Sequence, residues 1–197
     1  MTVTSVSWQI RRLADAAPVA WRNGGGVTHE LAAWPSVSAW VWRVSVAEVA
    51  KDGPFSYFPG VDRRFAVLSG AGVRLAFEDR VVALTPQDAP MAFSGEAACD
   101  CQLIAGATLD FNLMSRGLVA RLERFWQGPH FFEAQISDTL GFFAMDALQI
   151  AWGDETLSVP EQSLCWCVAT QPLRLQVKGT SFLGWSLSSA SEHGGPA

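Results

Sequence analysis

Two strand-like runs near the start of the chain carry polar side chains two residues apart. The run VTHEL holds Thr28 and Glu30, and the run AWVWRVSVA holds Arg43 and Ser45. Residues at this spacing share one face of a strand. Carboxylate, guanidinium and hydroxyl groups on one face can pair with each other or bind a small anion. In a small barrel such a face either meets solvent or lines a cavity, and the pattern alone allows both.

A loop of mixed aromatic and polar residues offers a second group of candidates. Residues 51–64 (KDGPFSYFPGVDRR) contain Gly-Pro and Pro-Gly turns and hold Ser56, Asp62 and Arg63. Loops of this composition commonly form the rim of a pocket. The alternative is a lid that only covers one open end of a barrel.

A third run, residues 108–114 (TLDFNLM), places Asp110 and Asn112 on one face of a strand. A surface strand could have this pattern. If the face is buried instead, both side chains need partners such as Arg43 or Arg63, because an unpaired buried polar group is costly.

Three consecutive glycines follow Asn23 in the stretch WRNGGGVTHEL. A phosphate-binding loop needs a lysine and a helix after its glycines, whereas strand-like residues without a lysine follow here. A flexible linker is disfavoured by Trp21 before the glycines and by the alternation after Gly26. We therefore predict a tight bend at which backbone passes close to another group. That group is either a ligand near Gly25 or a tryptophan packed against the bend.

Histidine and cysteine patterns argue against metal chemistry, and no metal or cofactor is expected. The three histidines, His29, His130 and His193, form no His-x-His pair, which disfavours a three-histidine centre in one barrel. The four cysteines form Cys-x-Cys pairs at 99/101 and 165/167 without the turn of a zinc knuckle, so we predict reduced, buried thiols. A Ser-His-Asp hydrolase is disfavoured because the chain has no Gly-x-Ser-x-Gly motif.

The composition is that of a globular protein with a real core: 197 residues, of which 49% are hydrophobic and 17% charged. The net charge is −5 and no basic run is present, so nucleic acid is not an expected partner. No segment has the length of a membrane span, and the first residues lack the apolar core of a signal peptide. We therefore expect a cytoplasmic protein without membrane association.

Short alternating runs separated by Gly, Pro, Asp and Asn predict an all-β fold of the sandwich or barrel type. The segment 113–125 tolerates helix, but Gly117 interrupts it and favours strand. Residues 188–197 are expected to form a disordered tail. Further strands are expected at 64–68, 72–77, 80–84, 99–104, 118–125, 140–144, 147–152, 164–169 and 173–177.

An internal echo indicates duplication. Residues 73–79 (VRLAFED) and 148–154 (LQIAWGD) share the order apolar, polar, apolar, Ala, aromatic, any residue, Asp. Each is followed by a second short run, a proline-marked turn and a Cys-x-Cys strand. A hairpin repeated about 75 residues apart predicts two fused small β-barrels, a bicupin. We place the halves at 1–116 and 117–187, with an approximate boundary across which strands can be exchanged.

Four stretches in this order resemble the HutD/Ves family: WRNGGGVTHEL at 21–31, WRVSVAEVAKDGPFSYFPGVDR at 42–63, VLSGAGVRL at 67–75 and LDFNLMSR at 109–116. The resemblance implies a bicupin with a regulatory role beside bacterial histidine utilisation, sensing a small intermediate such as urocanate or formylglutamate. An arginine in its pocket would pair with a carboxylate, and Trp42, Phe55 or Tyr57 would supply an apolar wall. The pocket it implies is formed by Asn23, Gly25, Thr28, Glu30, Arg43, Ser45, Ser56, Asp62, Arg63, Asp110 and Asn112.

These observations predict a metal-free protein that binds a small carboxylate metabolite and modulates its degradation pathway. The first alternative is an enzyme, an isomerase or hydrolase that uses Glu30 or Asp110 as a base. The second is a protein-interaction or structural module that forms a homodimer through its sheet edges. A barrel interior filled by side chains would favour this last alternative.

Overall fold

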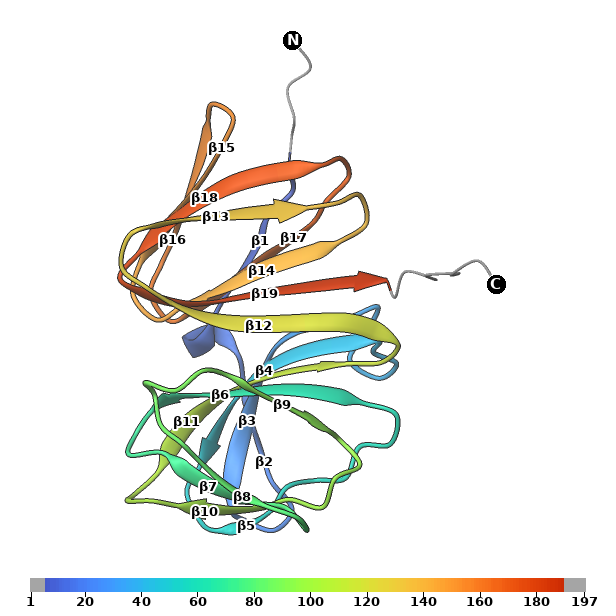
Figure 1. Ribbon diagram of the computed structural model, residues 1–197, viewed down its shortest axis with the longest axis vertical. Coiled ribbons are helices and arrows are strands. Elements are labelled where there is room, and N and C mark those ends of the chain that lie inside the picture. Colours follow the sequence, from blue (N-terminus) through green and yellow to red (C-terminus); the bar gives the residue numbers. More distant parts are fainter. Residues whose placement is uncertain (1–5, 190–197) are drawn as a thin grey trace.

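Strands form nearly all the regular structure of the protein, as the alternating patterns predict. The structure, a computed structural model, describes residues 6–189, and the short helical element within them is the 3-10 turn η1 (Leu13–Asp15). The strands form four antiparallel sheets in two stacked halves, the lower and upper parts of Figure 1. No helix in the described residues is long and apolar enough to cross a membrane.

The N-terminal half consists of β2 to β11. It has a six-stranded sheet in the order β2-β3-β4-β11-β6-β9 and a four-stranded sheet in the order β5-β10-β7-β8. In chain order these strands are β2 Pro18–Ala20, β3 Gly26–Trp34, β4 Trp42–Val49, β5 Gly53–Pro54, β6 Asp62–Ser69, β7 Val73–Ala76, β8 Val81–Leu84, β9 Met91–Ser94, β10 Asp100–Leu103 and β11 Thr108–Ser115.

The C-terminal half consists of β12 to β19 together with β1. It has a five-stranded sheet in the order β1-β17-β14-β19-β12 and a four-stranded sheet in the order β13-β18-β15-β16. In chain order these strands are β1 Gln9–Arg12, β12 Leu118–Trp126, β13 Pro129–Ala134, β14 Thr139–Ala144, β15 Leu148–Trp152, β16 Glu155–Val159, β17 Ser163–Val168, β18 Leu173–Gly179 and β19 Ser181–Ser189.

The two halves repeat the same strand order. Adding eight to each strand number converts β4-β11-β6-β9 into β12-β19-β14-β17, and β5-β10-β7-β8 into β13-β18-β15-β16. The echoed motifs lie in equivalent hairpins, with Val73 opposite Leu84 in β7–β8 and Leu148 opposite Val159 in β15–β16. The predicted repeated hairpin is therefore present in both halves.

The two Cys-x-Cys pairs are not equivalent, although each follows one copy of the echo. Cys101 lies on β10, whereas Cys165 and Cys167 lie on β17, which is the counterpart of β9. The repeat therefore does not extend to the cysteines, which lie on strands that are not counterparts. All four thiols are free and buried, as predicted.

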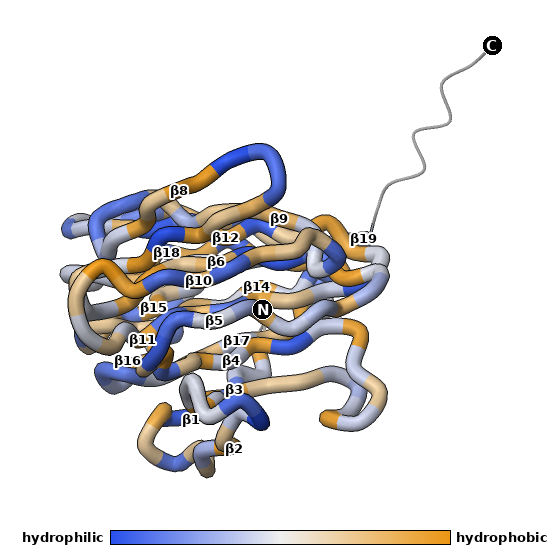
Figure 2. The backbone as a smooth tube through the Cα atoms, turned by 90° about the horizontal axis from the view of Figure 1, so that it is seen from below, coloured by the Kyte–Doolittle hydropathy of each residue, from blue (hydrophilic) through white to orange (hydrophobic). Residues whose placement is uncertain are grey.

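The larger sheets of the two halves pack against each other through their apolar faces. Trp42, Val44 and Val46 on β4 enter this shared core, and the ring centroids of Trp42 and Trp185 lie 5.5 Å apart. Hydrophobic and hydrophilic residues alternate along many strands when the molecule is viewed from below (Figure 2). Because successive strand residues point to opposite faces, Arg43 and Ser45 point away from the shared core and into the N-terminal half.

Arg124 on β12 connects the two halves through backbone carbonyl groups. Its Nη2 donates to the carbonyl oxygen of Val67 at 2.6 Å, and its Nε donates to that of Asp88 at 3.2 Å. Both acceptors belong to the N-terminal half. Hydrogen bonds from the guanidinium group therefore link β12 to β6 and to the loop that follows β8.

The strand β1 is part of the C-terminal half, although it precedes the N-terminal half in the sequence. β1 forms an edge of the C-terminal sheet, where Gln9 pairs with Trp166 and Arg12 with Ser163. The predicted tail at 188–197 overlaps the end of β19, which includes Ser188 and Ser189, and the rest of it lies outside the described residues.

The strand prediction for 113–125 is confirmed. β11 ends at Ser115 and β12 begins at Leu118, and Gly117 between them has a positive φ of 64° that suits a glycine turn. The strand β19, which lies between β14 and β12 in its sheet, was not predicted. Phe182 packs in the core of the C-terminal half while Leu183 and Trp185 pack in the shared core, so both faces are buried and no polar alternation marks the strand.

Candidate functional site

A cavity of about 810 Å³ lies within the N-terminal half. It is lined by seven of the eleven predicted site residues: Asn23, Thr28, Arg43, Ser45, Ser56, Arg63 and Asn112. The polar face of β4 therefore lines a cavity and does not lie on the outer surface. The other lining residues are Val19, Ala20, Trp21, Arg22, Ala47, Val49, Pro54, Phe55, Phe58, Phe65 and Met114.

The antiparallel register of β4, β11 and β6 places the central polar groups in one row. Met114 on β11 is paired with Arg43 on one side and with Arg63 on the other. In the next row of the same face, Asn112 lies between Ser45 and Phe65. Directly opposed residues in a sheet present their side chains on the same face, so both guanidinium groups enter the same cavity.

Arg63 is buried without a carboxylate partner among the described residues. Its side chain is only 4% exposed, and its Nη2 donates to Asn112 Oδ1 at 2.7 Å. The rings of Phe55 and Phe93 lie 5.0 and 4.8 Å from its Cζ, so the contacts are those of a cation–π cluster. Burial lowers its pKa to about 10, and the nearby charge of Arg43 acts in the same direction. The group nevertheless remains a cation near neutral pH.

Arg43 has a partial counter-charge in Glu30. Arg43 Nε lies 3.2 Å from Glu30 Oε2, but the N–H is not directed at that oxygen, so the contact is an ion pair and not a hydrogen bond. A break in the β3–β4 register after Glu30 gives β3 an extra residue at this point. Glu30 itself does not line the cavity. Arg22, Arg43 and Arg63 line the cavity and no carboxylate among the described residues does, so the positive charge in the cavity is not balanced.

The strap of residues 53–61 closes one side of the cavity and is held by three backbone contacts. The amide of Phe55 donates to Cys99 O at 2.9 Å, that of Phe58 to Gly95 O at 2.8 Å, and that of Gly60 to Glu96 Oε1 at 2.8 Å. Phe55, Ser56 and Phe58 line the cavity, as expected of a rim. Because the strap is pinned on both sides of Ser56, the cavity wall is already formed without a ligand.

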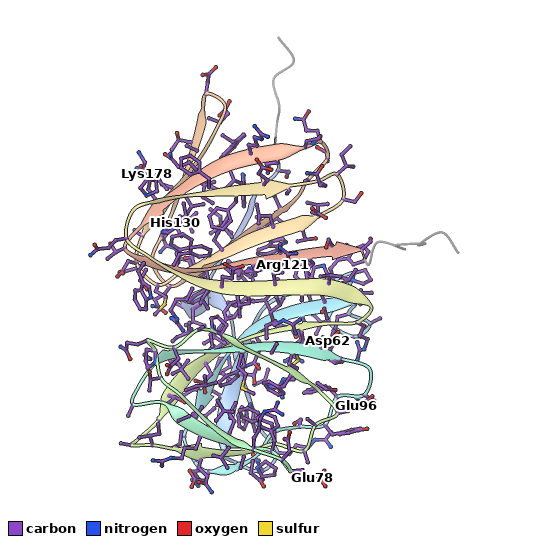
Figure 3. All side chains as sticks on the ribbon, in the orientation of Figure 1. Asp62, Glu78, Glu96, Arg121, His130 and Lys178 are labelled. Carbon is purple, nitrogen blue, oxygen red and sulfur yellow. The ribbon has the colours of Figure 1, made fainter. Side chains whose placement is uncertain are left out.

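Two of the three proposed apolar wall residues do not contribute to the cavity. Tyr57 is 65% exposed, and Trp42 lies in the shared core because it alternates with Arg43 on β4. Phe55 is the correct member of that group. Asp62 begins β6 at the surface and also lies outside the cavity lining, on the same side of the N-terminal half as Glu96 in Figure 3.

The triple glycine forms a bend that is packed against β4, and the prediction that Gly25 faces a ligand is not supported. Gly25 O accepts hydrogen bonds from the amides of Ala50 and Lys51, and its own N–H donates to Asn23 Oδ1 at 3.0 Å. A Cβ on Gly26 would lie 2.2 Å from Glu48 O. The alternative of close packing therefore describes Gly26, whereas the space at Gly24 is open. The effect of the glycines on the site is to orient Asn23, which does line the cavity.

Asp110 is fully buried but lies outside the cavity lining, and neither arginine partners it. Its Oδ2 accepts a hydrogen bond of 2.9 Å from Thr108 Oγ1, and its Oδ1 has no partner. Burial raises its pKa to about 7. The expectation that buried polar residues of β11 would meet Arg43 or Arg63 is thus correct for Asn112 and wrong for Asp110.

The described residues contain no cluster of three or more metal-ligating side chains. His29 Nδ1 lies 2.8 Å from Ala16 O, and His130 packs against Phe125 and Phe182. His193 lies outside the described residues.

The match to the HutD family model covers residues 13–185. The chain belongs to the HutD family. It is 31% identical over 156 residues to protein Ves of Cronobacter sakazakii, with 79% of this chain and 84% of that relative covered. It is 39% identical over 109 residues to an uncharacterised 21.2 kDa protein in the hutC 3′ region of Pseudomonas putida, covering 54% and 57%. It is also 39% identical over 98 residues to protein Ves of Escherichia fergusonii, covering 49% and 51%, so it spans about half the length of these last two.

Solved structures of HutD-family and cupin proteins share this fold. A conserved protein of unknown function from Pseudomonas aeruginosa PAO1 matches with a TM-score of 0.83 and 27% identity, covering 94% of this chain and 100% of the other. HutD from Pseudomonas fluorescens SBW25 (formate condition) matches with a TM-score of 0.81 at the same identity and coverage. A Cupin 2 barrel protein from Leptotrichia buccalis, 10% identical with a TM-score of 0.55, supports only the assignment of an all-β, cupin-like fold.

Several cavity residues of this HutD-family chain were not among the predicted set. Trp21 Nε1 donates to Thr28 Oγ1 at 2.8 Å and so orients a lining hydroxyl. Met114 is two residues from Asn112 on β11, and Phe65 is two residues from Arg63 on β6. Once Asn112 and Arg63 are known to line the cavity, alternation along the strands predicts that Met114 and Phe65 line it too. Arg22 carries no sequence signal for the cavity, because its placement depends on the bend at the glycines.

Proposed function

We propose that this protein binds a small carboxylate-bearing metabolite, without a metal, in the cavity of its N-terminal half. The observation that carries the proposal is Arg63, a buried guanidinium group that has no carboxylate partner in the described residues and lines an open space. A buried cation is costly unless it is paired. An anionic ligand would supply the missing partner, with Arg43 as a second contact.

The two halves share a strand order but differ in what fills their interiors, and this difference supports the proposal. We take the chain to be a bicupin with halves near 1–116 and 117–187, the first strand being exchanged into the second half. The interior of the C-terminal half is filled by the packed rings of Phe132, Phe142 and Phe182. The N-terminal half holds polar residues and a cavity instead, so we assign ligand binding to it alone.

We further propose that the ligand belongs to histidine utilisation, with urocanate and N-formylglutamate as the first candidates. Support comes from membership of the HutD family and from the relative in the hutC 3′ region. Each candidate has a carboxylate for Arg63 and Arg43. The planar part of urocanate or the acyl part of formylglutamate would contact Phe55 and Phe58. Binding of either would allow the protein to modulate that pathway in the cytoplasm.

Binding is favoured over catalysis by the composition of the cavity wall. No carboxylate, imidazole or thiol occurs among the described residues that line it. General acid–base chemistry needs such a group within hydrogen-bond reach of the substrate. Glu30 is paired with Arg43, and Asp110 is enclosed beside Thr108, so neither candidate base meets this requirement.

Calorimetric titration with urocanate and N-formylglutamate tests the proposal. We expect heat of binding with at least one of them, and a loss of about tenfold or more in affinity for Arg43→Ala and for Arg63→Ala. Arg74→Ala is the matched control, because Arg74 is exposed on β7. A folded protein that gives no heat with either ligand, or arginine variants that bind like the wild type, would contradict the proposal.

A further inference from the structure

Asp110 is a buried acid that the proposed binding site does not use directly. Its carboxyl group is 0% exposed, and Thr108 satisfies one oxygen while the other has no partner. An ionised carboxylate with an unmet oxygen in an apolar interior is strongly disfavoured, and a proton removes the charge. The local structure therefore favours the neutral form of Asp110.

The position of Asp110 links it to the anion site. It lies two residues before Asn112 on the same face of β11, so their Cα atoms are separated by about 7 Å at the usual strand rise. Asn112 in turn accepts the hydrogen bond from Arg63. The β6–β11 register also shifts next to Asp110, which is paired with Val67 while Leu109 is paired with Ser69. Ala47, which is paired with Asp110 on the neighbouring strand β4, lines the cavity, so Asp110 lies directly beside the cavity wall.

We propose that binding of an anion in the cavity is coupled to the uptake of a proton by Asp110. This inference rests on the proposed function and adds a regulation to it. When Asp110 is ionised, its negative charge repels the anion. When Asp110 is neutral, the anion meets the full field of Arg43 and Arg63. Affinity is then highest at low pH and falls as the pH rises through the titration of Asp110.

Other charged and titratable groups lie on the elements around Asp110. On β10 the Cys101 thiol has a pKa raised to about 12, chiefly by burial and next by Asp110 itself, so it stays neutral. Arg43 on β4 and Arg63 on β6 line the cavity beside it. Asp52 is exposed after β4 and accepts a hydrogen bond from the amide of Leu103. The residues paired directly with Asp110 are Ala47 and Val67, which carry no charge.

The size of the coupling follows from Coulomb's law. Two unit charges on the order of 10 Å apart, at an effective dielectric constant of about 20, change an affinity by about tenfold. Burial places the pKa of Asp110 at about 7, so the change is centred near neutral pH. The bound anion raises this pKa further, and the complex therefore holds more protons than its separated components.

The test is a calorimetric titration of the full chain with N-formylglutamate between about pH 5.5 and about pH 8.5, where both carboxylates of the ligand stay ionised. We expect the affinity of the wild type to fall by about tenfold over this range, and Asp110→Asn to keep the low-pH affinity throughout. Asp100→Asn, which alters an exposed carboxylate on β10, should keep the wild-type pH dependence.

A second measurement needs no variant. Near pH 7 the heat of binding should depend on the ionisation enthalpy of the buffer, with uptake of a fraction of one proton per ligand. Affinity independent of pH, or no proton uptake by the wild type, would overturn the coupling and leave the proposed function intact. If N-formylglutamate and urocanate both fail to bind at every pH, the proposed function itself is wrong, and the coupling that rests on it is wrong as well.

Discussion

Arg63 and Asn112 are joined across β6 and β11 by a hydrogen bond of 2.7 Å from Nη2 to Oδ1, and the guanidinium group has no carboxylate beside it in the described residues. The amide can accept this hydrogen bond without cancelling the charge. Asn112 therefore fixes the direction of the guanidinium group while leaving its positive charge available to the cavity. An Asp at this position would form a closed ion pair instead.

A double-mutant cycle on this pair should show strong coupling. Asn112→Leu leaves Arg63 buried without its partner, and Arg63→Met leaves Asn112 unsatisfied, so each single change should lower the unfolding free energy by about 1–3 kcal/mol. Arg63→Met/Asn112→Leu should cost less than the sum, because a matched apolar pair replaces a matched polar one. Urea denaturation of the free protein measures this, and strict additivity would contradict the coupling.

Glu30→Gln should strengthen the binding of carboxylates several-fold. Glu30 supplies the partial counter-charge of Arg43, and its neutralisation leaves more positive potential in the cavity. Titration at low and high salt checks the cause, since an electrostatic gain shrinks at high ionic strength. If a metabolite is turned over by the wild type and not by this variant, Glu30 is a catalytic base and the binding-only function is wrong.

Asp110→Asn should be more stable than the wild type in alkaline solution. The pKa of Asp110 is raised from 3.8 to about 7 in the folded protein, so the folded state holds its proton more tightly than the unfolded state. Wild-type stability therefore declines from about pH 4 to about pH 7 and stays at the lower level above that. At about 1.4 kcal/mol per pKa unit, the contribution is a few kcal/mol. Unfolding curves of the two proteins should converge near pH 4 and separate by pH 8, and a constant difference would contradict this.

The alternation of residues allowed the strands and their two faces to be predicted, but not what covers each face. The run AWVWRVSVA separates Trp42 from Arg43 correctly, because the strand period depends only on local geometry. Whether the polar face meets solvent or a cavity depends on β11 and β6, which are distant in the sequence. Trp42 was assigned to the pocket wall for its chemistry alone, although its position on β4 sends it to the shared core.

Features of the structure that depend on contacts between distant segments could not be predicted from local sequence patterns. The burial of Arg63 follows from the strap and from β9, since Phe55 and Phe93 enclose it. The pairing of β1 with β17 joins two strands that are far apart in the sequence, and no pattern in the residues of β1 indicates which strand it pairs with. Asp110 was predicted to belong to the pocket and lies outside its lining, because a sequence cannot tell that Asn112 on the same strand takes the arginine instead.

Gly26→Ala should destabilise the protein more than Gly24→Ala, although both change the same triplet. A Cβ at position 26 would collide with Glu48 O at 2.2 Å, and both atoms belong to backbone that cannot move easily. We expect a loss of about 2 kcal/mol or more from such overpacking. At position 24 the space is open and only the positive φ of 66° is unfavourable, at about 1 kcal/mol. Thermal unfolding measures both, and the reverse order would refute the packing explanation.

Arg124→Met should weaken the contact between the two halves. It removes two hydrogen bonds from a charged donor to the carbonyl groups of Val67 and Asp88, at a cost of about 2–4 kcal/mol. Arg121→Met is the control, because Arg121 is exposed on the same strand and is labelled in Figure 3. Urea unfolding should show a large effect for the first variant and about 0.5 kcal/mol or less for the second. Equal effects would mean that the carbonyl contacts contribute nothing.

The pairing of Gln9 with Trp166 constrains the order in which the strands can pair during synthesis. A ribosome synthesises β1 first, yet the strand that receives it emerges only when most of the chain has been translated. During synthesis β1 must therefore remain unpaired while the N-terminal half folds beside it. Among the paired strands of residues 6–189, this pairing closes the longest loop, which makes it a slow step by loop entropy. The strand β1 is thus among the last of the described strands to form its native pairing.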